Sequence, residues 1–494
     1  MKKLFLGLLF SFFINFSSAQ TDKPTDYLSS QFHKERREAL RKKMPKNSVA
    51  VFFGNPERNR SNDVDFIYHQ DPNFYYLTGY NEPNCVLVLF SEEQKNNEGN
   101  LISEILYVQE KNSKAEQWTG IRLGVEGAKK DLGFENSFNG KEFLKSGINF
   151  QKFDTVFFTE FKNDIRDSKK DEACLYKLVS SFKEQIGYNS KRDEKNETSF
   201  HKEVDGVKQI NSKKVKLDAT TLDDYMAGLR EIKSKEELAL ITKAVRISAM
   251  GQREIMKAMH IGMSEFEIQG IHEYIYKKYG SEYEGYPSIV GAGNNGCVLH
   301  YIENSKTKVE NDLVLMDLGA EYHGYTADVT RTIPANGKFS IEQKLIYDLV
   351  YQAQEAGIAA VIIGNGFKDP DQVGRKIITE GLMKLGIISN PADSRIYFPH
   401  GTSHHIGLDV HDPGKYENFE ENMILTVEPG IYIPKGSNCD KKWWGIAVRI
   451  EDDILVTKNG PINLSAEAPR KSDEIEALMK EKSVLDGFVL PDIK

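Results

Sequence analysis

The pattern of apolar and polar positions divides the chain into two parts of different texture. In the first part, short apolar runs typical of buried strands occur at residues 48–54, 74–79, 85–90, 102–108 and 155–159. Polar stretches that favour helices separate most of these runs, and residues 27–44 form the first helix. The pattern predicts an N-terminal α/β domain of about 200 residues.

Longer helical periodicity begins after residue 222. Apolar side chains follow a helical spacing over residues 233–259, and a second helix is expected at residues 264–279. Further helices are expected at residues 341–362, 370–385 and 472–482, with strands and turns between them. This mixture predicts an α+β domain over residues 222–494. The polar, charge-dense stretch 183–214 marks the boundary, so the first domain is expected over residues 20–215.

Residues 1–19 differ from both domains. Lys2 and Lys3 precede an apolar run over residues 4–16, and small residues follow at positions 17–19. This order predicts a secretory signal peptide that is cleaved after Ala19. The run is too short to span a bilayer, and no later segment is long and apolar enough to do so. We therefore expect an exported protein without a membrane span, either periplasmic or secreted.

Composition narrows the class of protein. Hydrophobic residues make up 39% and charged residues 28% of the chain, as in soluble globular proteins. The net charge of −8 argues against a nucleic-acid partner, which would favour a basic surface. The 4 cysteines contain no CxxC pair, so we expect mostly free, buried thiols rather than a disulfide framework.

Two acidic residues in the second domain are the first candidates for chemistry. Runs with strand composition on both sides of residues 322–324 predict a hairpin. A register centred between Tyr322 and His323 would place Asp317 opposite Asp328, with Cβ atoms about 4.5–5.5 Å apart. Two carboxylates this close resist joint ionisation unless a cation lies between them. The pair is either half of a metal site or two ordinary acids near the ends of edge strands.

Four more segments carry candidate residues. Residues 400–407 contain 3 of the 11 histidines in the chain. Glu428 ends a predicted strand just before a Pro-Gly turn, while Arg449 and Glu451 share one face of another strand. His300 ends a glycine-rich stretch that lacks the lysine and the helix of a phosphate-binding loop. Each of these residues alone is compatible with a structural role, as a core histidine, a turn cap or a strand ion pair.

Together these segments offer a set of metal ligands from separate strands of one domain. The set comprises Asp317, Asp328, His404, Glu428 and Glu451. Hard oxygen ligands with a single imidazole suit Mn²⁺, with Zn²⁺, Fe²⁺ and Co²⁺ as alternatives. Five ligands, several of them able to bridge, suit two ions about 3.5–4 Å apart. A hydroxide shared by such a pair is a nucleophile for an amide carbonyl at neutral pH.

These motifs resemble the pita-bread metallopeptidase family, which includes aminopeptidase P, prolidase and methionine aminopeptidase. The resemblance is greatest to aminopeptidase P, the group of Xaa-Pro aminopeptidases. The matching stretches are IVGAGNNGCVLHYIEN, LVLMDLGAEYHGYTADVTRT, HGTSHHIGLDVHD, LTVEPGIYI and VRIEDD, in that order. In the N-terminal part NFYYLTGYNEP and EQWTGIRLG also match, so the resemblance covers nearly all of the mature chain. It implies a pita-bread catalytic domain preceded by the N-terminal α/β domain.

The resemblance also implies a role for each matching ligand. Asp317, Asp328, His404, Glu428 and Glu451 would hold two divalent ions. Asp328 and Glu451 would bridge both ions, and Glu428 would also handle the proton of the bridging water. We expect these ions to be Mn²⁺.

On the substrate side, the resemblance implies a further set of residues. His300, His400 and His411 would line the cleft and steady the scissile carbonyl or the tetrahedral intermediate. Arg449 would support the ligands or contact the substrate, and Tyr432 would face the cleft. His405 departs from the family pattern, in which we expect an apolar or aromatic residue beside the histidine ligand.

The activity implied is that of a dinuclear metal-dependent aminopeptidase. It would release the first residue from peptides with proline at the second position, by attack of a metal-bridging hydroxide. Prolidase, which cleaves only Xaa-Pro dipeptides, is the alternative, and the choice depends on whether the cleft admits a third residue. The large N-terminal domain disfavours a methionine aminopeptidase, and the complete ligand set disfavours a metal-free, creatinase-like member. A non-catalytic peptide-binding protein on the same fold would have lost a metal carboxylate or His404.

The N-terminal domain supplies none of the expected ligands. By resemblance it would roof the cleft and support association into dimers or tetramers. Trp118, in the EQWTGIRLG stretch, would then reach the active site of a neighbouring subunit and offer an aromatic wall to a proline ring. In the alternative, Trp118 packs in the core of its own domain.

Overall fold

The computed structural model describes residues 24–96, 98–169, 171–188 and 215–488. The predicted signal peptide at residues 1–19 therefore lies outside the described residues. Within the described part, no helix combines the length and the apolar character needed to cross a membrane.

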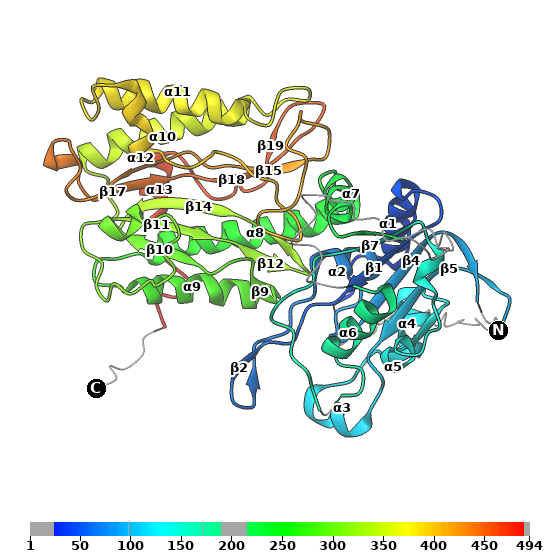
Figure 1. The fold of residues 1–494 in the computed structure, drawn as a ribbon. Helices are drawn as coiled ribbons and strands as arrows, with labels where there is room; N and C mark the ends of the chain where they lie inside the picture. The colour runs from blue at the N-terminus through cyan, green and yellow to red at the C-terminus, as the bar shows by residue number, and fades with distance from the viewer. Residues whose placement is uncertain (1–23, 97, 170, 189–214, 489–494) are drawn as a thin grey trace, which may run out of the picture.

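The N-terminal part is built on a mixed sheet of 6 strands in the order β6-β5-β4-β1-β7-β8 (Figure 1). Its strands are β1 (Ser48–Phe53), β4 (Val86–Lys95), β5 (Leu101–Val108), β6 (Ser137–Asn139), β7 (Thr155–Phe158) and β8 (Lys216–Asp218). A short hairpin, β2 (Asn59–Ser61) and β3 (Val64–Asp65), extends away from the sheet. Every residue of the central strand β1 is buried, as expected for a strand covered on both faces. The predicted strands at residues 48–54, 85–90, 102–108 and 155–159 are confirmed.

Helices cover this sheet. They are α1 (Ser30–Lys43), α2 (Pro72–Thr78), α3 (Ser113–Thr119), α4 (Gly124–Leu132), α5 (Gly140–Phe143) and α6 (Leu175–Ile186). Residues 74–79, predicted as a strand, form α2 instead. The Asp71 side chain accepts hydrogen bonds from the first turn, Pro72 opens the helix, and Gly79 closes it with a φ of +69°. These end signals outweigh an aromatic composition that by itself favours a strand.

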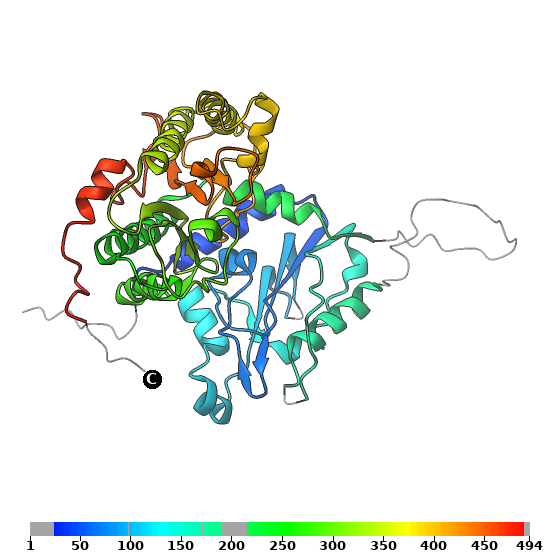
Figure 2. The same ribbon diagram turned by 90° about the vertical axis from the view of Figure 1, so that its left-hand side faces the viewer.

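In the C-terminal part, pairs of helices enclose several small sheets (Figures 1 and 2). The helices are α7 (Thr221–Arg230), α8 (Lys235–Ala258), α9 (Glu265–Lys278), α10 (Ile341–Ala359), α11 (Asp369–Lys384), α12 (Ser394–Tyr397) and α13 (Ser472–Leu478). The strands are β9 (Tyr283–Glu284), β10 (Ile289–Ala292), β11 (Leu313–Leu318), β12 (Ala320–Tyr322), β13 (Tyr325–Thr326), β14 (Val329–Pro334), β15 (Ile424–Val427), β16 (Gly430–Ile433), β17 (Ile446–Arg449), β18 (Asp452–Leu455) and β19 (Ile462–Asn463). The α8–α9 pair lies on one side of the strands and the α10–α11 pair on the other. The five helices predicted in this part are confirmed.

The central hairpin forms, but with a different register from the predicted one. Tyr322 pairs with Tyr325, so the loop consists of His323 and Gly324, whose φ angles are +51° and +86°. Two-residue hairpin loops of this kind need positive φ at both positions, and glycine supplies it at little cost. Asp317 consequently pairs with Thr330 rather than with Asp328.

One apolar core runs without interruption through both parts. It begins at the N-terminal sheet with residues such as Phe52 and Leu87, includes Met226 of α7 and Ile241 of α8, and reaches Tyr325 in the hairpin. A second cluster fills the space between the C-terminal strands and helices α9, α10 and α13. The N-terminal part is therefore packed onto the C-terminal part rather than tethered to it.

We predict opposite effects for two glycine-to-alanine substitutions. A Cβ at Gly319, between β11 and β12, would meet the carbonyl oxygen of Ala327 at 1.9 Å and a ring carbon of Tyr286 at 2.7 Å. Gly319→Ala should therefore destabilise the protein by about 1–3 kcal/mol, as overpacking does. A Cβ at Gly270, in the exposed face of α9, meets nothing within 4 Å. Gly270→Ala should raise stability by about 0.5–1 kcal/mol, and urea unfolding of both variants measures the contrast.

Candidate metal centre

A cavity of about 750 Å³ opens among the small sheets of the C-terminal part. It brings together nine of the residues singled out in the sequence: His300, Asp317, Asp328, His400, His404, His411, Glu428, Arg449 and Glu451. They come from segments as far apart in the chain as residues 300 and 451, so only the tertiary fold assembles them. Two of the predicted substrate-side residues, Tyr432 and Trp118, are not among the side chains that line this cavity.

Three buried side chains form the closest group of potential metal ligands. Asp328, His404 and Glu451 each offer one ligand atom, and these atoms lie within 4.8 Å of one another. Asp328 follows β13, and its N–H donates a hydrogen bond of 3.0 Å to Asp453. Glu451 lies between β17 and β18, where its N–H donates to the carbonyl oxygen of Thr330 at 3.1 Å. Hydrogen bonds thus fix the backbone from which both carboxylates project.

The tautomer of His404 suits a metal ligand. Its Nδ1 lies 3.0 Å from the carbonyl oxygen of His405, which can only accept a hydrogen bond, so Nδ1 carries the proton. The lone pair of Nε2 therefore faces the cavity, 3.5 Å from an oxygen of Asp328 and 3.6 Å from one of Glu428. An imidazole oriented in this way by a carbonyl is the usual arrangement of a metal-binding histidine.

Asp317 joins this group through shared partners. The hydroxyl of Tyr286 lies 2.6 Å from Oδ1 of Asp317 and 2.5 Å from Oδ1 of Asp328. On the other side, Nη2 of Arg449 donates to Oδ2 of Asp317 at 2.5 Å. The two aspartates therefore meet although the strand register does not place them opposite each other.

Thr330 links the remaining charged residues of the two neighbouring strands. Its hydroxyl donates a 2.6 Å hydrogen bond to Oε2 of Glu451 and accepts a 3.4 Å bond from Nε of Arg449. Arg449 and Glu451 thus point to the same side, as their spacing predicts. Arg449 contacts the ligand set rather than open solvent, since only 4% of it is exposed.

The pKa shifts of the carboxylates indicate that this cluster lacks positive charge. Burial raises the pKa of Asp328 and of Glu451 well above the usual range, and the neighbouring carboxylates add to both shifts. Burial likewise raises the pKa of Glu428 to about 7. At Asp317, burial also acts to raise the pKa, but the guanidinium of Arg449 holds it below its ordinary value. One arginine is too little positive charge for this cluster, and divalent cations among the oxygen ligands would relieve the repulsion.

The three histidines on the substrate side have different environments. His300 and His411 are exposed at the cavity wall, and the ring of His411 stacks on that of His404 with centroids 4.0 Å apart. His400 lies deeper, with Nε2 2.7 Å from the hydroxyl of Tyr432. Burial lowers the pKa of both His400 and His411 to about 4, so both are neutral at pH 7.

Tyr432 lies behind the cavity wall instead of facing the cleft. It is buried, and its hydroxyl accepts a 2.8 Å hydrogen bond from Nη1 of Arg449 while contacting His400. Tyr432 therefore orients two residues that line the cleft.

His405 is a packing residue. Its ring is fully buried against Phe367 and Tyr416, with centroids 4.5 Å and 4.9 Å away. Neither ring nitrogen has a hydrogen-bond partner among the described residues, and burial lowers its pKa to about 4. A neutral imidazole thus occupies the position where an apolar or aromatic side chain was expected, and it packs against its neighbours as such a side chain would.

Sequence reasoning missed two residues of this site. Tyr286 precedes β10 in the stretch SEYEGYPS, where nothing indicated that this tyrosine would reach two aspartates. Asp453 lies within the VRIEDD motif, and its position beside Glu451 was the available signal. Burial raises the pKa of Asp453 to about 8.

Trp118 lies on α3, which Figure 1 shows at the lower end of the N-terminal part, and it is not among the side chains that line the cavity. Its side chain is 88% exposed. The alternative in which it packs in the core of its own domain is therefore wrong.

The 4 cysteines are free, as predicted, and Cys85 and Cys174 are buried.

The raised pKa values predict a pH-dependent response to divalent cations. A carboxyl whose pKa is raised on folding stabilises the fold below its unfolded pKa and loses that contribution as the pH rises through the folded value. For Glu428 the loss falls between about 4.5 and about 7. The metal-free protein should therefore lose stability towards pH 8, while cation binding strengthens as protons leave the ligands.

The measurement is thermal unfolding after chelation, with and without added Mn²⁺, at pH 5.5 and pH 8. We expect a clearly larger rise in Tm at the higher pH. Sodium chloride at matched ionic strength is the control. An equal rise at both pH values would contradict a cation site built on these carboxylates.

Comparisons with known proteins agree with this geometry. The model of metallopeptidase family M24 matches residues 239–458, and that of the aminopeptidase P N-terminal domain matches residues 33–149. The Xaa-Pro aminopeptidase of Escherichia coli (strain K12) is 34% identical over 92% of this chain and 98% of its own length. Among solved structures, Pseudomonas aeruginosa aminopeptidase PepP superposes with a TM-score of 0.79 at 31% identity, covering 92% of this chain and 98% of that one. Escherichia coli aminopeptidase P with the inhibitor Pro-Leu gives a TM-score of 0.78 at 33% identity, with the same coverage.

These matches span both parts of the molecule. They confirm the expected architecture, an N-terminal α/β domain followed by a pita-bread catalytic domain. The chain therefore belongs to metallopeptidase family M24, in its aminopeptidase P branch, and is a metalloexopeptidase.

Proposed function

We propose that this protein is an Xaa-Pro aminopeptidase that releases the N-terminal residue from peptides with proline at the second position. The observation that carries the proposal is the buried group of Asp328, His404 and Glu451, flanked by Asp317 and Glu428 in one large cavity. The substrate class is supported by two relatives that match this chain over 98% of their own length, both of which are named Xaa-Pro aminopeptidase.

Two divalent ions fit the five ligands, and the hard oxygen donors with one imidazole favour Mn²⁺. Bound there, the ions would supply an activated hydroxide for attack on the Xaa-Pro bond and would polarise its carbonyl group.

The side chains of this chain have distinct tasks in such a reaction. Glu428, whose carboxylate lines the cavity beside His404, is suited to take a proton from the attacking water and to give it to the leaving proline nitrogen. His300 and His411, at the cavity wall, can donate hydrogen bonds to the carbonyl oxygen as negative charge develops on it. Arg449 and Tyr432 hold Asp317 and His400 in position.

The size of the cavity favours an aminopeptidase over a dipeptidase. Its volume of about 750 Å³ lies in the upper part of the range of roughly 300–1,000 Å³ for sites that enclose small ligands. The cavity thus has room for residues beyond an Xaa-Pro dipeptide. A prolidase, by contrast, requires a cleft that ends after the proline.

The test is hydrolysis of Ala-Pro, Ala-Pro-Gly and Ala-Ala-Gly by protein that has been chelated and then reloaded with Mn²⁺. We expect Ala-Pro-Gly to be cleaved at its first bond, with little cleavage of Ala-Ala-Gly, and no activity before reloading. Preferential cleavage of Ala-Pro would identify a prolidase. Binding of Ala-Pro-Gly without cleavage, in fully loaded protein, would indicate a non-catalytic protein.

Two neighbouring histidines provide a matched pair of variants for the same assay. His404→Ala should lose both bound metal and activity, because the loss of a ligand weakens the site. His405→Phe should keep both, since a phenyl ring preserves the contacts with Phe367 and Tyr416. Full activity of His404→Ala with both ions bound would refute the ligand assignment.

We also propose that the protein forms a dimer or tetramer through its N-terminal part. Trp118 and Ile121 are 88% and 86% exposed, and Ile67, beyond the β2–β3 hairpin, is 77% exposed. Such apolar exposure is typical of a surface that a partner covers. In an assembly of this kind, Trp118 would be free to approach the cleft of a neighbouring copy.

Trp118→Ala tests this role directly. We expect weaker association in sedimentation at several concentrations and slower turnover of Ala-Pro-Gly, with unchanged metal content. The protomer should keep its Tm, because the side chain makes few contacts in its own chain. Phe266→Ala, at an aromatic residue on α9 that is 62% exposed, is the matched control. Unchanged kinetics and association in Trp118→Ala would overturn the proposal.

A further inference from the structure

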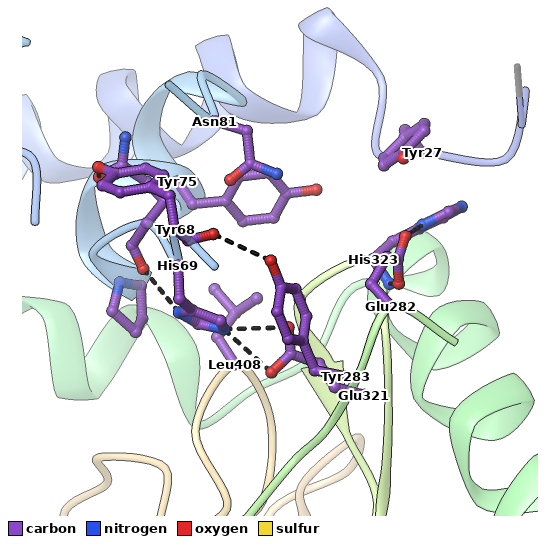
Figure 3. A pocket seen from close by; sticks show the side chains of 13 residues that line it. Tyr27, Tyr68, His69, Tyr75, Asn81, Glu282, Tyr283, Glu321, His323 and Leu408 are labelled. Atoms are coloured by element: carbon purple, nitrogen blue, oxygen red, sulfur yellow. Dashed lines mark hydrogen bonds and ion pairs between the residues drawn. The ribbon is translucent and has the colours of Figure 1, made fainter. Parts of the chain in front are cut away.

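The loop formed by residues 405–412 lies where the two parts of the molecule meet, and it ends beside the metal centre. A cavity of about 120 Å³ marks this junction. Figure 3 shows Leu408 of the loop on its floor, close to His69 of the N-terminal part and to Glu321 of the hairpin. Three residues further along, His411 lines the metal-binding cavity. The loop therefore touches both the domain junction and the catalytic cleft.

Asp412 fixes the end of this loop next to His411. Only 1% of Asp412 is exposed, and its carboxylate accepts hydrogen bonds from Arg230 and, at 2.7 Å, from Nζ of Lys233. The N–H of Asp412 donates to the carbonyl oxygen of His405 at 3.0 Å, which fixes the peptide group that follows His411. At Gly407 a Cβ would meet Oδ2 of Asp412 at 2.5 Å, so the loop closes tightly around this carboxylate.

Arg230 connects this loop to the N-terminal part. It is the last residue of α7, is 2% exposed, and donates a 2.8 Å hydrogen bond to Asp409 as well as binding Asp412. Its Nη1 donates to Oδ1 of Asn73, at the start of α2, at 2.8 Å. A planar guanidinium thus spans three acceptors in a fixed geometry, which a lysine could not do.

We propose that Asp412 is a positioning residue for His411. Arg230 joins Asp412 to Asn73 of the N-terminal part, so the position of Asn73 determines the position of Asp412. This inference rests on the proposed peptidase function, and it gives the N-terminal part a role beyond controlling access. His411 contacts the substrate side of the cleft, while Asn73, Arg230 and Asp412 act only through it. Arg230 and Asp412, the middle links of this chain of contacts, are buried, so small displacements of α2 are passed to the backbone that carries the His411 ring.

Asn73 offers the sharpest test because its side chain makes only the outer contact of this chain. Asn73→Ala removes the acceptor for Arg230 and leaves the buried ion pairs with Asp412 intact. We expect kcat for Ala-Pro-Gly to fall about tenfold, with unchanged metal content, as for the loss of an outer partner of a catalytic group. Asn73→Asp restores an acceptor and should restore kcat. Asn81→Ala, at an exposed asparagine of the same junction without a hydrogen bond to Arg230, is the control.

A double-mutant cycle distinguishes positioning of His411 from a general structural effect. If Asn73 acts through His411, then Asn73→Ala should cause no further loss in a His411→Ala background. An equal loss in both backgrounds would overturn the proposal, as would wild-type kinetics of Asn73→Ala. Asp409→Ala, which removes another acceptor of Arg230, provides a second variant if Asn73→Ala proves unstable, and the same cycle applies to it.

Hydrogen exchange gives a readout that does not depend on catalysis. Amides in residues 405–412 should exchange faster in Asn73→Ala than in the wild type or in Asn81→Ala. Unchanged exchange there would overturn the positioning chain. Absence of peptide cleavage by the wild type, together with faster exchange in Asn73→Ala, would instead contradict the proposed function and leave the mechanical link standing.

Discussion

Four carboxylates buried in one cleft impose the constraint on which the rest of this structure depends. Like charges this close raise one another's pKa, and removing them from water adds to the cost. The strands around the cleft are arranged to contain that cost. The hydroxyls of Tyr286 and Thr330 donate hydrogen bonds to Asp328 and Glu451, and the guanidinium of Arg449 stabilises Asp317. The remaining imbalance is what makes this a site for cations rather than an ion-pair network.

The division of labour between the two parts is less strict than the location of the ligands indicates. All five proposed ligands belong to the C-terminal part, yet the apolar core continues from the N-terminal sheet to the hairpin at residues 320–326. The loop that carries His411 is bonded to α7 and, through Arg230, to α2. The proposed ligands come from the C-terminal part, whereas both parts determine the shape of the cleft.

Much of this site could be predicted from the sequence, because its charged residues occur within apolar strands. A charge at such a position is costly unless it serves a function. Asp317 and Asp328 are examples, and their segments were placed correctly. The hairpin register was not, since the positive φ at His323 and Gly324 moved the turn along the chain. Residues 74–79 became a helix because its capping residues prevailed over aromatic composition. Tyr286 could not be found at all, as its partners are brought to it only by the tertiary fold. His405 suggested chemistry by its type, but burial made it a packing residue.

The hydroxyl of Tyr286 has only one hydrogen to give, and two aspartates lie within 2.6 Å of it. Whichever carboxylate receives that hydrogen, the other faces an oxygen lone pair. Arg449 serves only Asp317, so the two acids differ before anything binds. The two carboxylates are thus inequivalent by construction, and a cation that approached Asp317 would meet a different environment from one that approached Asp328.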